Sequence, residues 1–357
     1  VPFSIFGEGA ISDAAVDYVS AQLNDQFEQE QVVLSSSLSG DLVDLWGAGE
    51  TLFAIGAEYR EERSETAPDE LALNENTFAN IIEPTVGSFD VYEIYGELSV
   101  PLLKDKPFAQ SMNLNLAGRY SDYSSFGGAS TYGGSVDWVP VDSLKLRGGY
   151  ARAVRVPNIG ELFAAASQTF VQITDPCDSR NIADGPIAGA RERNCAALGL
   201  TLPFEDLQPN ASNSAFNSGN LGLNEEVSDT YFAGFTYTPS FIDGFIMDVN
   251  YFDISIDDAV VFQSAQQLVN NCYDAADGPN LAFCNLFDRD NAINEVANII
   301  VGPVNFAQVG TKGVDFAMAY RQDFADIYKG FSSVPGAFNL SLAGTYVIDN
   351  TAQSDPN

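Results

Sequence analysis

The chain has 357 residues, with 16 Lys and Arg against 49 Asp and Glu, a formal net charge of −33, and no histidine. So acidic a chain excludes nucleic-acid binding, because few cations are available to neutralise phosphates. The absence of histidine excludes Ser-His-Asp and Cys-His catalytic sites and histidine-ligated zinc within this polypeptide. Hydrophobic residues make up 45% of the chain, which is enough for a folded core.

The first 31 residues lack the alternating pattern of the rest of the chain. Ser12 is placed to cap a helix, and Ala15, Val19 and Leu23 follow at helical spacing. We therefore interpret residues 1–31 as a loop that contains a short helix.

From residue 32 onward the repeated signal is alternation with a period of two. Along 112–120, Leu114 and Leu116 share one face, while Asn113 and Asn115 share the other. The same pattern predicts about ten strands, over residues 32–46, 50–64, 88–101, 111–124, 130–139, 143–154, 227–239, 244–260, 304–322 and 337–349. No apolar run approaches the roughly 18 residues that a membrane-spanning helix needs.

The predicted strands are longer than the usual five or six residues. The links between them alternate along the chain, since each short link is followed by a link that is in most cases longer. The longest links are 155–226 and 261–303. Long loops at one end and short turns at the other are typical of membrane β-barrels. Tyrosines near predicted strand ends suit an aromatic girdle at a lipid–water boundary: Tyr120, Tyr123, Tyr132, Tyr150, Tyr237, Tyr251 and Tyr346.

We therefore predict an all-β fold, an antiparallel transmembrane β-barrel, with a soluble β-sandwich or propeller as the alternative. Alternation places eight residues on the lipid side, namely Met112, Leu114, Leu116, Val314, Phe316, Met318, Phe338 and Leu342. It places five on the lumen side, namely Asn113, Asn115, Arg119, Asp315 and Ser341. We also expect Arg147 and Arg152 to face the lumen.

The four cysteines form two local pairs, one in each of the longest links. Cys177 lies near Cys195, and Cys272 lies near Cys284, without histidine or a C-x-x-C motif. This spacing favours two local disulfides over metal or redox chemistry, and hence an oxidising compartment. We expect no cofactor and no metal site. Calcium is the alternative for the acidic residues of the second long link and the strand end before it, namely Asp257, Asp258, Asp288, Asp290 and Glu295. The run that begins at Asp288 fails the calcium-loop pattern at its third ligand, so we interpret these carboxylates as solvated loop charge.

Motifs that follow the sixth predicted strand point to a known family. Arg155-Val156-Pro157-Asn158-Ile159-Gly160-Glu161-Leu162 is followed by Gly219-Asn220-Leu221-Gly222-Leu223-Asn224-Glu225-Glu226, and then by Gly313-Val314-Asp315-Phe316. In this order the motifs resemble the barrel of TonB-dependent outer-membrane receptors. The residues that carry the resemblance are Arg155, Pro157, Asn158, Glu161, Leu162, Gly219, Asn220 and Glu226. Val156 departs from the small residue that is usual there.

The resemblance implies that 32–357 is a partial receptor barrel, the C-terminal half, without the plug, the TonB box or the closing strands. It places residues 1–31 and the links 155–226 and 261–303 outside a Gram-negative cell. It implies active uptake of a scarce nutrient, not enzymatic catalysis. The implied partners are outer-membrane lipid, the TonB complex through the missing part, and a nutrient ligand. Siderophore, saccharide, peptide and cobalamin all remain open.

Two other functions remain open at this stage. One is a passive porin-like channel, and the other is a surface protein whose acidic loops serve adhesion or docking. Ligand-binding candidates are Arg180, Arg191 and Arg193, which could hold an anionic ligand. The alternative is that they neutralise nearby carboxylates, namely Asp175, Asp178, Asp184 and Glu192.

Overall fold

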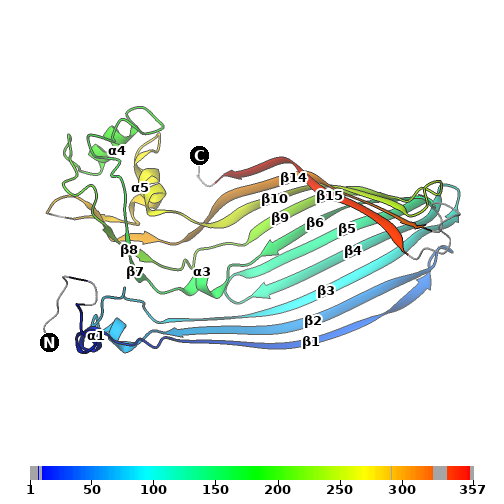
Figure 1. Ribbon diagram of the computed structural model, residues 1–357, viewed down its shortest axis with the longest axis horizontal. Coiled ribbons are helices and arrows are strands. Elements are labelled where there is room, and N and C mark those ends of the chain that lie inside the picture. Colours follow the sequence, from blue (N-terminus) through cyan, green and yellow to red (C-terminus); the bar gives the residue numbers. More distant parts are fainter. Residues whose placement is uncertain (1–6, 8–9, 291, 325–335, 354–357) are drawn as a thin grey trace.

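The computed structural model describes residues 7, 10–290, 292–324 and 336–353. Its main feature is one antiparallel sheet of ten strands in the order β1-β2-β3-β4-β5-β6-β9-β10-β14-β15 (Figure 1). The strands are β1 (Gln26–Asp44), β2 (Glu50–Ala67), β3 (Thr85–Lys106), β4 (Ala109–Tyr123), β5 (Gly127–Val141), β6 (Leu144–Arg155), β9 (Glu226–Tyr237), β10 (Phe245–Phe262), β14 (Pro303–Asp323) and β15 (Ala337–Gln353).

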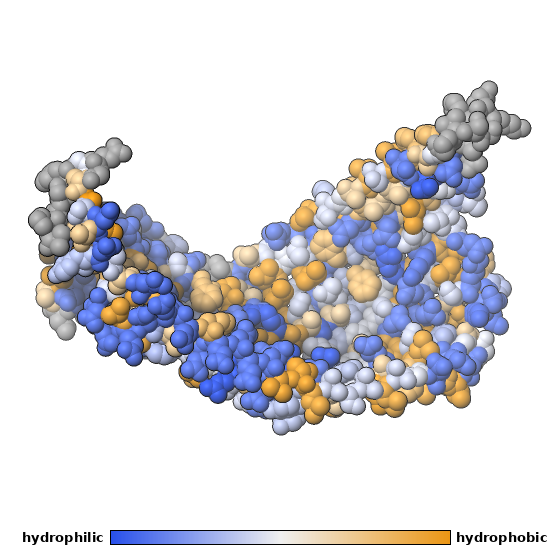
Figure 2. All heavy atoms as spheres, turned by 60° about the horizontal axis from the view of Figure 1, so that its bottom comes forward, coloured by the Kyte–Doolittle hydropathy of each residue, from blue (hydrophilic) through white to orange (hydrophobic). Residues whose placement is uncertain are grey.

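All ten predicted strands are present, and most extend beyond their predicted bounds. β1 begins at Gln26, within the segment expected to be a loop, because its ladder to β2 continues to the Gln26–Ala67 pair. Backbone hydrogen bonds need no alternation of side chains, so the pattern underestimates strand length. Within the described part no ladder joins β1 to β15, and the sheet is open. Figure 2 shows it as a hollowed trough.

The short elements lie mainly in the long links. The helices are α1 (Asp13–Val19), α2 (Glu70–Leu73), α3 (Ile159–Phe163), α4 (Ala190–Ala197), α5 (Ala265–Tyr273) and α6 (Leu281–Cys284). The additional strands are β7 (Ser167–Val171), β8 (Asn213–Asn217), β11 (Asp288–Arg289), β12 (Val296–Ala297) and β13 (Ile299–Val301). Ser12 caps α1 as expected, and the helix ends at Val19. None of the described helices is both long and apolar enough to span a membrane.

The strand register divides the sheet into two faces. The polar face includes Glu93, Glu97, Asn115, Arg119, Asp137, Arg147, Asp248 and Asp315. The apolar face includes Leu38, Ile94, Leu98, Leu116, Tyr132, Tyr231, Phe316 and Leu342. The thirteen residues assigned to faces from alternation lie on the predicted sides. The links after β2, β4, β6 and β10 leave one end of the sheet, here named the loop rim.

Two side chains lie on the face opposite to the predicted one. Arg152 lies beside Tyr132 and Asp229 on the apolar face, where its Nη2 is 2.7 Å from the Asp229 carboxylate. The hydroxyl of Tyr150 also donates to Asp229, at 2.5 Å. Tyr123 pairs with Val91 on the polar face, outside the tyrosine girdle. Arg152 and Arg147 are five residues apart, so strand geometry sends them to opposite faces.

Candidate functional site

The motif around Arg155 joins four elements at the loop rim. Arg155 ends β6, and its two terminal nitrogens lie 3.0 and 3.1 Å from the carboxylate of Glu161 on α3. Its Nε also donates to Glu226, the first residue of β9. Glu226 in turn accepts a hydrogen bond of 2.6 Å from the backbone N–H of Val260 on β10. One guanidinium therefore ties both ends of the 155–226 link to the sheet.

The helix α3 is fixed at this position by its cap. The side chain of Asn158 accepts from the N–H of Glu161 at 2.9 Å, and the Glu161 carboxylate accepts from the N–H of Asn158 at 2.8 Å. This reciprocal pair is a capping box, which satisfies two N–H groups that a helix start leaves unpaired. Pro157 and Leu162 are buried next to it. The cap aims Glu161 at Arg155.

The Gly219-Asn220 motif returns the chain to the same place. The N–H of Gly219 donates to the carbonyl of Ala164 at 2.7 Å, and the N–H of Asn220 donates to the carbonyl of Glu161 at 2.8 Å. A Cβ on Gly219 would lie 2.7 Å from the carbonyl oxygen of Leu162, so only glycine fits without a shift. The eight motif residues, distant in the sequence, form this structure, here named the rim junction: Arg155, Pro157, Asn158, Glu161, Leu162, Gly219, Asn220 and Glu226.

Beyond the rim junction, the two longest links fold together into one unit, here named the loop module (residues 167–217 and 264–301). Strand β13 of the second link pairs in parallel with β8 of the first. The amide of Asn213 donates to the carbonyl of Val296 at 2.7 Å. Buried side chains from both links share one core: Ile173, Cys177, Cys195, Leu200, Phe204, Ala215, Ala265, Leu268, Val269, Cys272, Tyr273, Phe283, Phe287, Val296 and Ile299.

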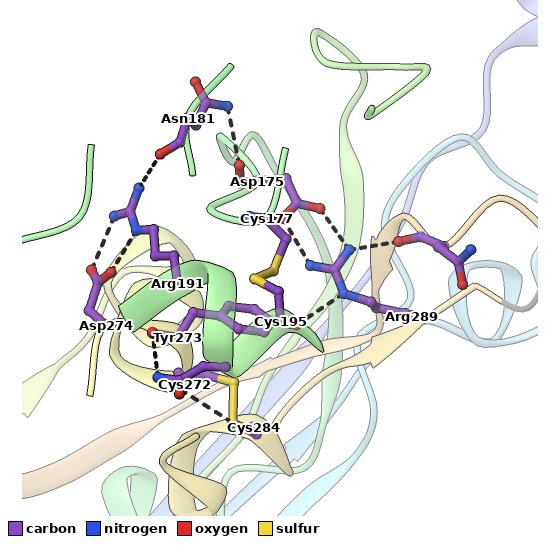
Figure 3. Close-up of a disulfide and its surroundings, with 12 residues drawn as sticks. Asp175, Cys177, Asn181, Arg191, Cys195, Cys272, Tyr273, Asp274, Cys284 and Arg289 are labelled. Carbon is purple, nitrogen blue, oxygen red and sulfur yellow. Dashed lines mark hydrogen bonds and ion pairs between the residues drawn. A yellow bond between two sulfur atoms is a disulfide. The ribbon is translucent and has the colours of Figure 1, made fainter. Parts of the chain in front are cut away.

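Both predicted disulfides are present within the loop module (Figure 3). Cys177 pairs with Cys195, and Cys272 pairs with Cys284. The Cys177–Cys195 bond attaches the chain before α4 to that helix, and the Cys272–Cys284 bond joins α5 to α6. Because each disulfide stays within one link, contacts of another kind must hold the two links together.

Arg289 provides one of the polar contacts between the links. Its guanidinium donates to both carboxylate oxygens of Asp175, at 2.7 and 2.9 Å, and to the hydroxyl of Tyr273 at 3.0 Å (Figure 3). It also lies 5.4 Å from the ring centres of Phe204 and Tyr273. Burial alone would lower the pKa of Arg289, but its hydrogen bonds to Asp175 raise this pKa above the usual range. Arg289 therefore stays protonated.

The three arginines predicted as ligand contacts all have protein partners. Arg191 is held by Asp274 at 2.6 and 3.1 Å, and its side chain is only 9% exposed. Arg193 donates to the backbone carbonyls of Ala275 and Ala276. Arg180 pairs with Asp178 but keeps 56% of its side chain exposed. The structure thus brings them into one module and gives each an internal partner, and a ligand role stays a prediction.

The contact with Arg180 controls the charge of Asp178. Hydrogen bonds from Arg180, opposed by burial and aided by backbone N–H groups, lower the pKa of Asp178 to about 2. The backbone N–H of Asp206 is one of those donors, at 2.7 Å. Asp178 is therefore ionised at neutral pH, where it accepts from Arg180 and from the backbone N–H of Asp206.

Sequence reasoning missed Arg289, Asp175 and Tyr273 as a group. Asp175 was expected only to neutralise the arginines of its own link, but it binds Arg289 in the other one. One signal was available, since Arg289 is the only basic residue in 261–303. Within the described residues, no group of three or more Cys, Asp and Glu side chains is arranged to hold a metal ion.

The polar face carries side-chain hydrogen bonds between strands, at two places. Arg147 on β6 lies 2.6 Å from the carboxylate of Asp248 on β10 and donates to Asn250 at 2.7 Å. Arg119 on β4 pairs with Glu93 on β3 at 3.2 Å. These arginines are therefore bound to carboxylates of the same face.

A hollow of about 480 Å³ lies over the polar face between β2 and β9. The register places Glu97, Ala117, Gly133, Ala151 and Thr230 side by side on five neighbouring strands. The next row carries Ser99, Asn115, Ser135, Gly149 and Phe232. Three small residues thus form a low floor between a carboxylate and an aromatic ring.

Comparisons with known proteins identify the type of barrel. The family model described as "TonB dependent receptor-like, beta-barrel" matches residues 5–357. A search of curated protein sequences finds no match to the chain. The siderophore receptor PirA from Acinetobacter baumannii is similar in structure, with a TM-score of 0.54 at 14% identity, over 90% of this chain and 37% of that one. A ferric enterobactin receptor variant from Pseudomonas aeruginosa, solved with enterobactin, gives a TM-score of 0.56 at 14% identity, over 90% and 36%. The chain thus spans little more than a third of the length of these two receptors.

Proposed function

Because the chain belongs to the TonB-dependent receptor family, whose β-barrel model covers residues 5–357, we propose that it forms part of a receptor that takes up a scarce nutrient. Proteins of this family lie in the outer membrane of Gram-negative bacteria and are transporters, not enzymes. The single observation that carries the proposal is the combination, in one sheet, of an apolar outer face, a polar inner face and a rim junction that holds a folded loop module.

The apolar face supports a position in lipid. Its side chains include exposed Leu34, Leu38, Ile94 and Leu342, which water would disfavour. A row of tyrosines crosses the same face toward the loop rim: Tyr59, Tyr92, Tyr120, Tyr132, Tyr150, Tyr231, Tyr251 and Tyr346. Their rings suit the level of the lipid headgroups, because one end of each ring is apolar and the other polar.

The loop module supports an extracellular role. In outer-membrane barrels the long loops face the medium and the short turns face the periplasm. The two disulfides suit an oxidising environment. We infer that residues 10–25 and the loop module lie outside the cell, and that the rim junction holds the module above the lumen. In this position the module would meet the nutrient first.

Energy coupling is the second part of the proposal. The chain spans little more than a third of the length of the two receptors described above, so coupling through TonB would involve parts of the receptor other than these residues. The polar face, with its ion-paired arginines, would form the lumen wall along which the nutrient passes. For ligand capture, Arg180 is the most accessible of the three arginines proposed, and its pair with Asp178 would have to open.

Energy-dependent uptake tests the proposal against a passive channel. Cells that produce the receptor and cells that lack it would be given labelled ferric siderophore, oligosaccharide, oligopeptide and cobalamin. We expect receptor-dependent accumulation of one of these, and we expect a protonophore to abolish it. Accumulation that persists with the protonophore would overturn the proposal in favour of a porin-like channel. Unchanged accumulation after removal of the loop module would favour a docking or adhesion role for the loops.

A further inference from the structure

We infer that the apolar face of the sheet carries a seat for one membrane lipid, whose acyl chain lies along β1 to β4 and whose headgroup carries an ammonium group. This inference rests on the proposed function, because it names a lipid partner of the apolar face. Two grooves adjoin on this face, with volumes of about 670 and 370 Å³. Together they are here named the outer furrow, which on β3 extends from Tyr92 to Leu98 and on β4 from Asp122 to Leu116.

The outer furrow has the length of one lipid leaflet. On β3 the first groove is lined by Tyr92 and Ile94 and the second by Gly96 and Leu98, which follow one another on the same face. The strand between Tyr92 and Leu98 spans roughly 20 Å. Because barrel strands are tilted by about 40°, this length covers about 15 Å of depth, which is half of the roughly 30 Å hydrocarbon core. One acyl chain of one leaflet therefore fits along the outer furrow.

The floor of the outer furrow is lower than the packing of the protein itself requires. Gly96 and Gly118 are neighbours on β3 and β4, and neither has a left-handed backbone. A Cβ on Gly96 would lie 3.7 Å from the side chain of Ile55, and one on Gly118 would lie 3.9 Å from a backbone oxygen, which are ordinary contact distances. By contrast, a Cβ on Gly56 would collide with the ring of Tyr95. Since glycine weakens a strand and often marks the close approach of a ligand, we place the acyl chain over Gly96 and Gly118.

The end of the outer furrow that lies toward the loop rim is acidic. Tyr59 and Tyr92 border this end at the level of the tyrosine row, with their ring centres 4.9 Å apart. Asp122 lies beside Tyr92, and Asp90 lies on the same face two positions nearer the loop rim. Among the described residues, no ion pair reaches the carboxylate of Asp90 or Asp122. A cation that neutralises them would therefore come from outside the sheet.

The strands on both sides of these carboxylates are present. β3 is paired with β2 and β4, and β4 is paired with β3 and β5, so no further strand can pair beside Asp90 or Asp122. Chain that pairs with the open edge of β1 would continue the sheet in its own plane, on the side of β1 that is away from the outer furrow. A plug would lie against the opposite, polar face. The outer furrow over β3 and β4 therefore meets the membrane itself.

An ammonium headgroup suits this end better than an anionic one. An ammonium group offers three N–H donors and a positive charge to two carboxylates that lack a cation. The hydroxyls of Tyr59 and Tyr92 lie at the level of the headgroup, where they can donate to its phosphate or ester oxygens. A headgroup with a net negative charge would instead be repelled by Asp90 and Asp122. The occupant is thus a zwitterionic phospholipid with a primary amine.

Lipid retention by the purified full receptor tests the headgroup. The receptor in mild detergent is given equal amounts of phosphatidylethanolamine and phosphatidylglycerol with the same acyl chains, and native mass spectrometry counts the bound molecules. We expect phosphatidylethanolamine to be retained about fivefold more, which is the effect of one exposed pair of opposite charges. Asp90→Asn combined with Asp122→Asn should remove this preference. Asp253→Asn combined with Asp257→Asn, on β10 of the same face, should keep it.

Filling the outer furrow tests the acyl chain. Gly96→Leu and Ala57→Leu each place a side chain where the chain would lie, so each should reduce retention of phosphatidylethanolamine about fivefold. Ala233→Leu, on β9 of the same face, should leave retention unchanged. The melting temperature of each variant shows whether it is folded.

Unchanged retention in either folded variant would overturn the inference. Retention of more phosphatidylglycerol than phosphatidylethanolamine, or of detergent alone, would also overturn it. These measurements need no energised membrane, so lipid retention can fail while uptake remains energy-dependent, and the two proposals can be judged separately.

Discussion

Replacement of Arg289 by methionine should cause a large loss of stability that is confined to the loop module, because Arg289 binds Asp175 in the other half of the module. Asp175 is only 3% exposed, and Arg289 is 15% exposed. Removal of one partner of a buried ion pair costs about 3–5 kcal/mol, because the other charge stays buried without compensation. We expect about 3 kcal/mol here, since Asp175 keeps a hydrogen bond of 2.9 Å from the N–H of Cys177.

Hydrogen exchange followed by mass spectrometry measures this loss directly. A change of about 3 kcal/mol raises the opening equilibrium more than a hundredfold, so amides of α5 and β8 should exchange much faster in Arg289→Met than in the unaltered receptor. Amides of β4 and β5 should keep their rates, because the disturbance is confined to the loop module. Lys312→Met is the matched control, since Lys312 and Asp349 are 40% and 48% exposed and such pairs contribute about 1 kcal/mol or less.

A double variant separates the ion pair from simple loss of packing. Asp175→Asn removes the charge that Arg289→Met leaves unpaired, so the double variant should be more stable than the sum of the single effects implies. The reasoning would be refuted if α5 exchanged within threefold of the unaltered rate in Arg289→Met. It would also be refuted if the two single effects were additive.

Three further predictions concern the loop module, the rim junction and the sheet. The lowered pKa of Asp178 stabilises the loop module by on the order of 1–2 kcal/mol above about pH 4, and this stabilisation is lost as the pH falls toward 2. The acid-induced unfolding of the loop module should therefore lack this contribution in Asp178→Asn, and the same pH dependence of unfolding in the variant and the unaltered receptor would contradict the assignment. Gly219→Ala should destabilise the rim junction by about 1–3 kcal/mol, because the new methyl group meets backbone atoms, whereas Gly222→Ala meets only the end of a side chain; equal protease resistance at the loop rim would count against this. Spin labels at Leu114 and Asn115 should differ in their accessibility to a lipid-soluble quencher, which should reach only the label at Leu114. Equal accessibility of the two labels would argue against a barrel wall.

The alternation of side chains determined much of the fold in advance. A strand sends neighbouring residues to opposite faces, so the pattern of Leu114, Asn115 and Leu116 predicts their sides without knowledge of any partner strand. The same rule separates Arg152 from Arg147, because the two residues are five positions apart in one strand. The disulfides were also predictable, because Cys177–Cys195 and Cys272–Cys284 each lie within one link. The capping box of α3 is likewise a local signal, carried by Asn158 and Glu161.

Only the tertiary structure decided which distant residues meet. Arg289 and Asp175 are 114 positions apart, and nothing in their separate links indicates that the links share a core. Gly219 needs to be glycine only because the chain returns against the carbonyl of Leu162. Likewise, the hollow exists because the register aligns Ala117 and Gly133 on neighbouring strands. Alternation fixes the face of a residue, but the register of each ladder and the packing of long loops depend on contacts summed over the whole sheet.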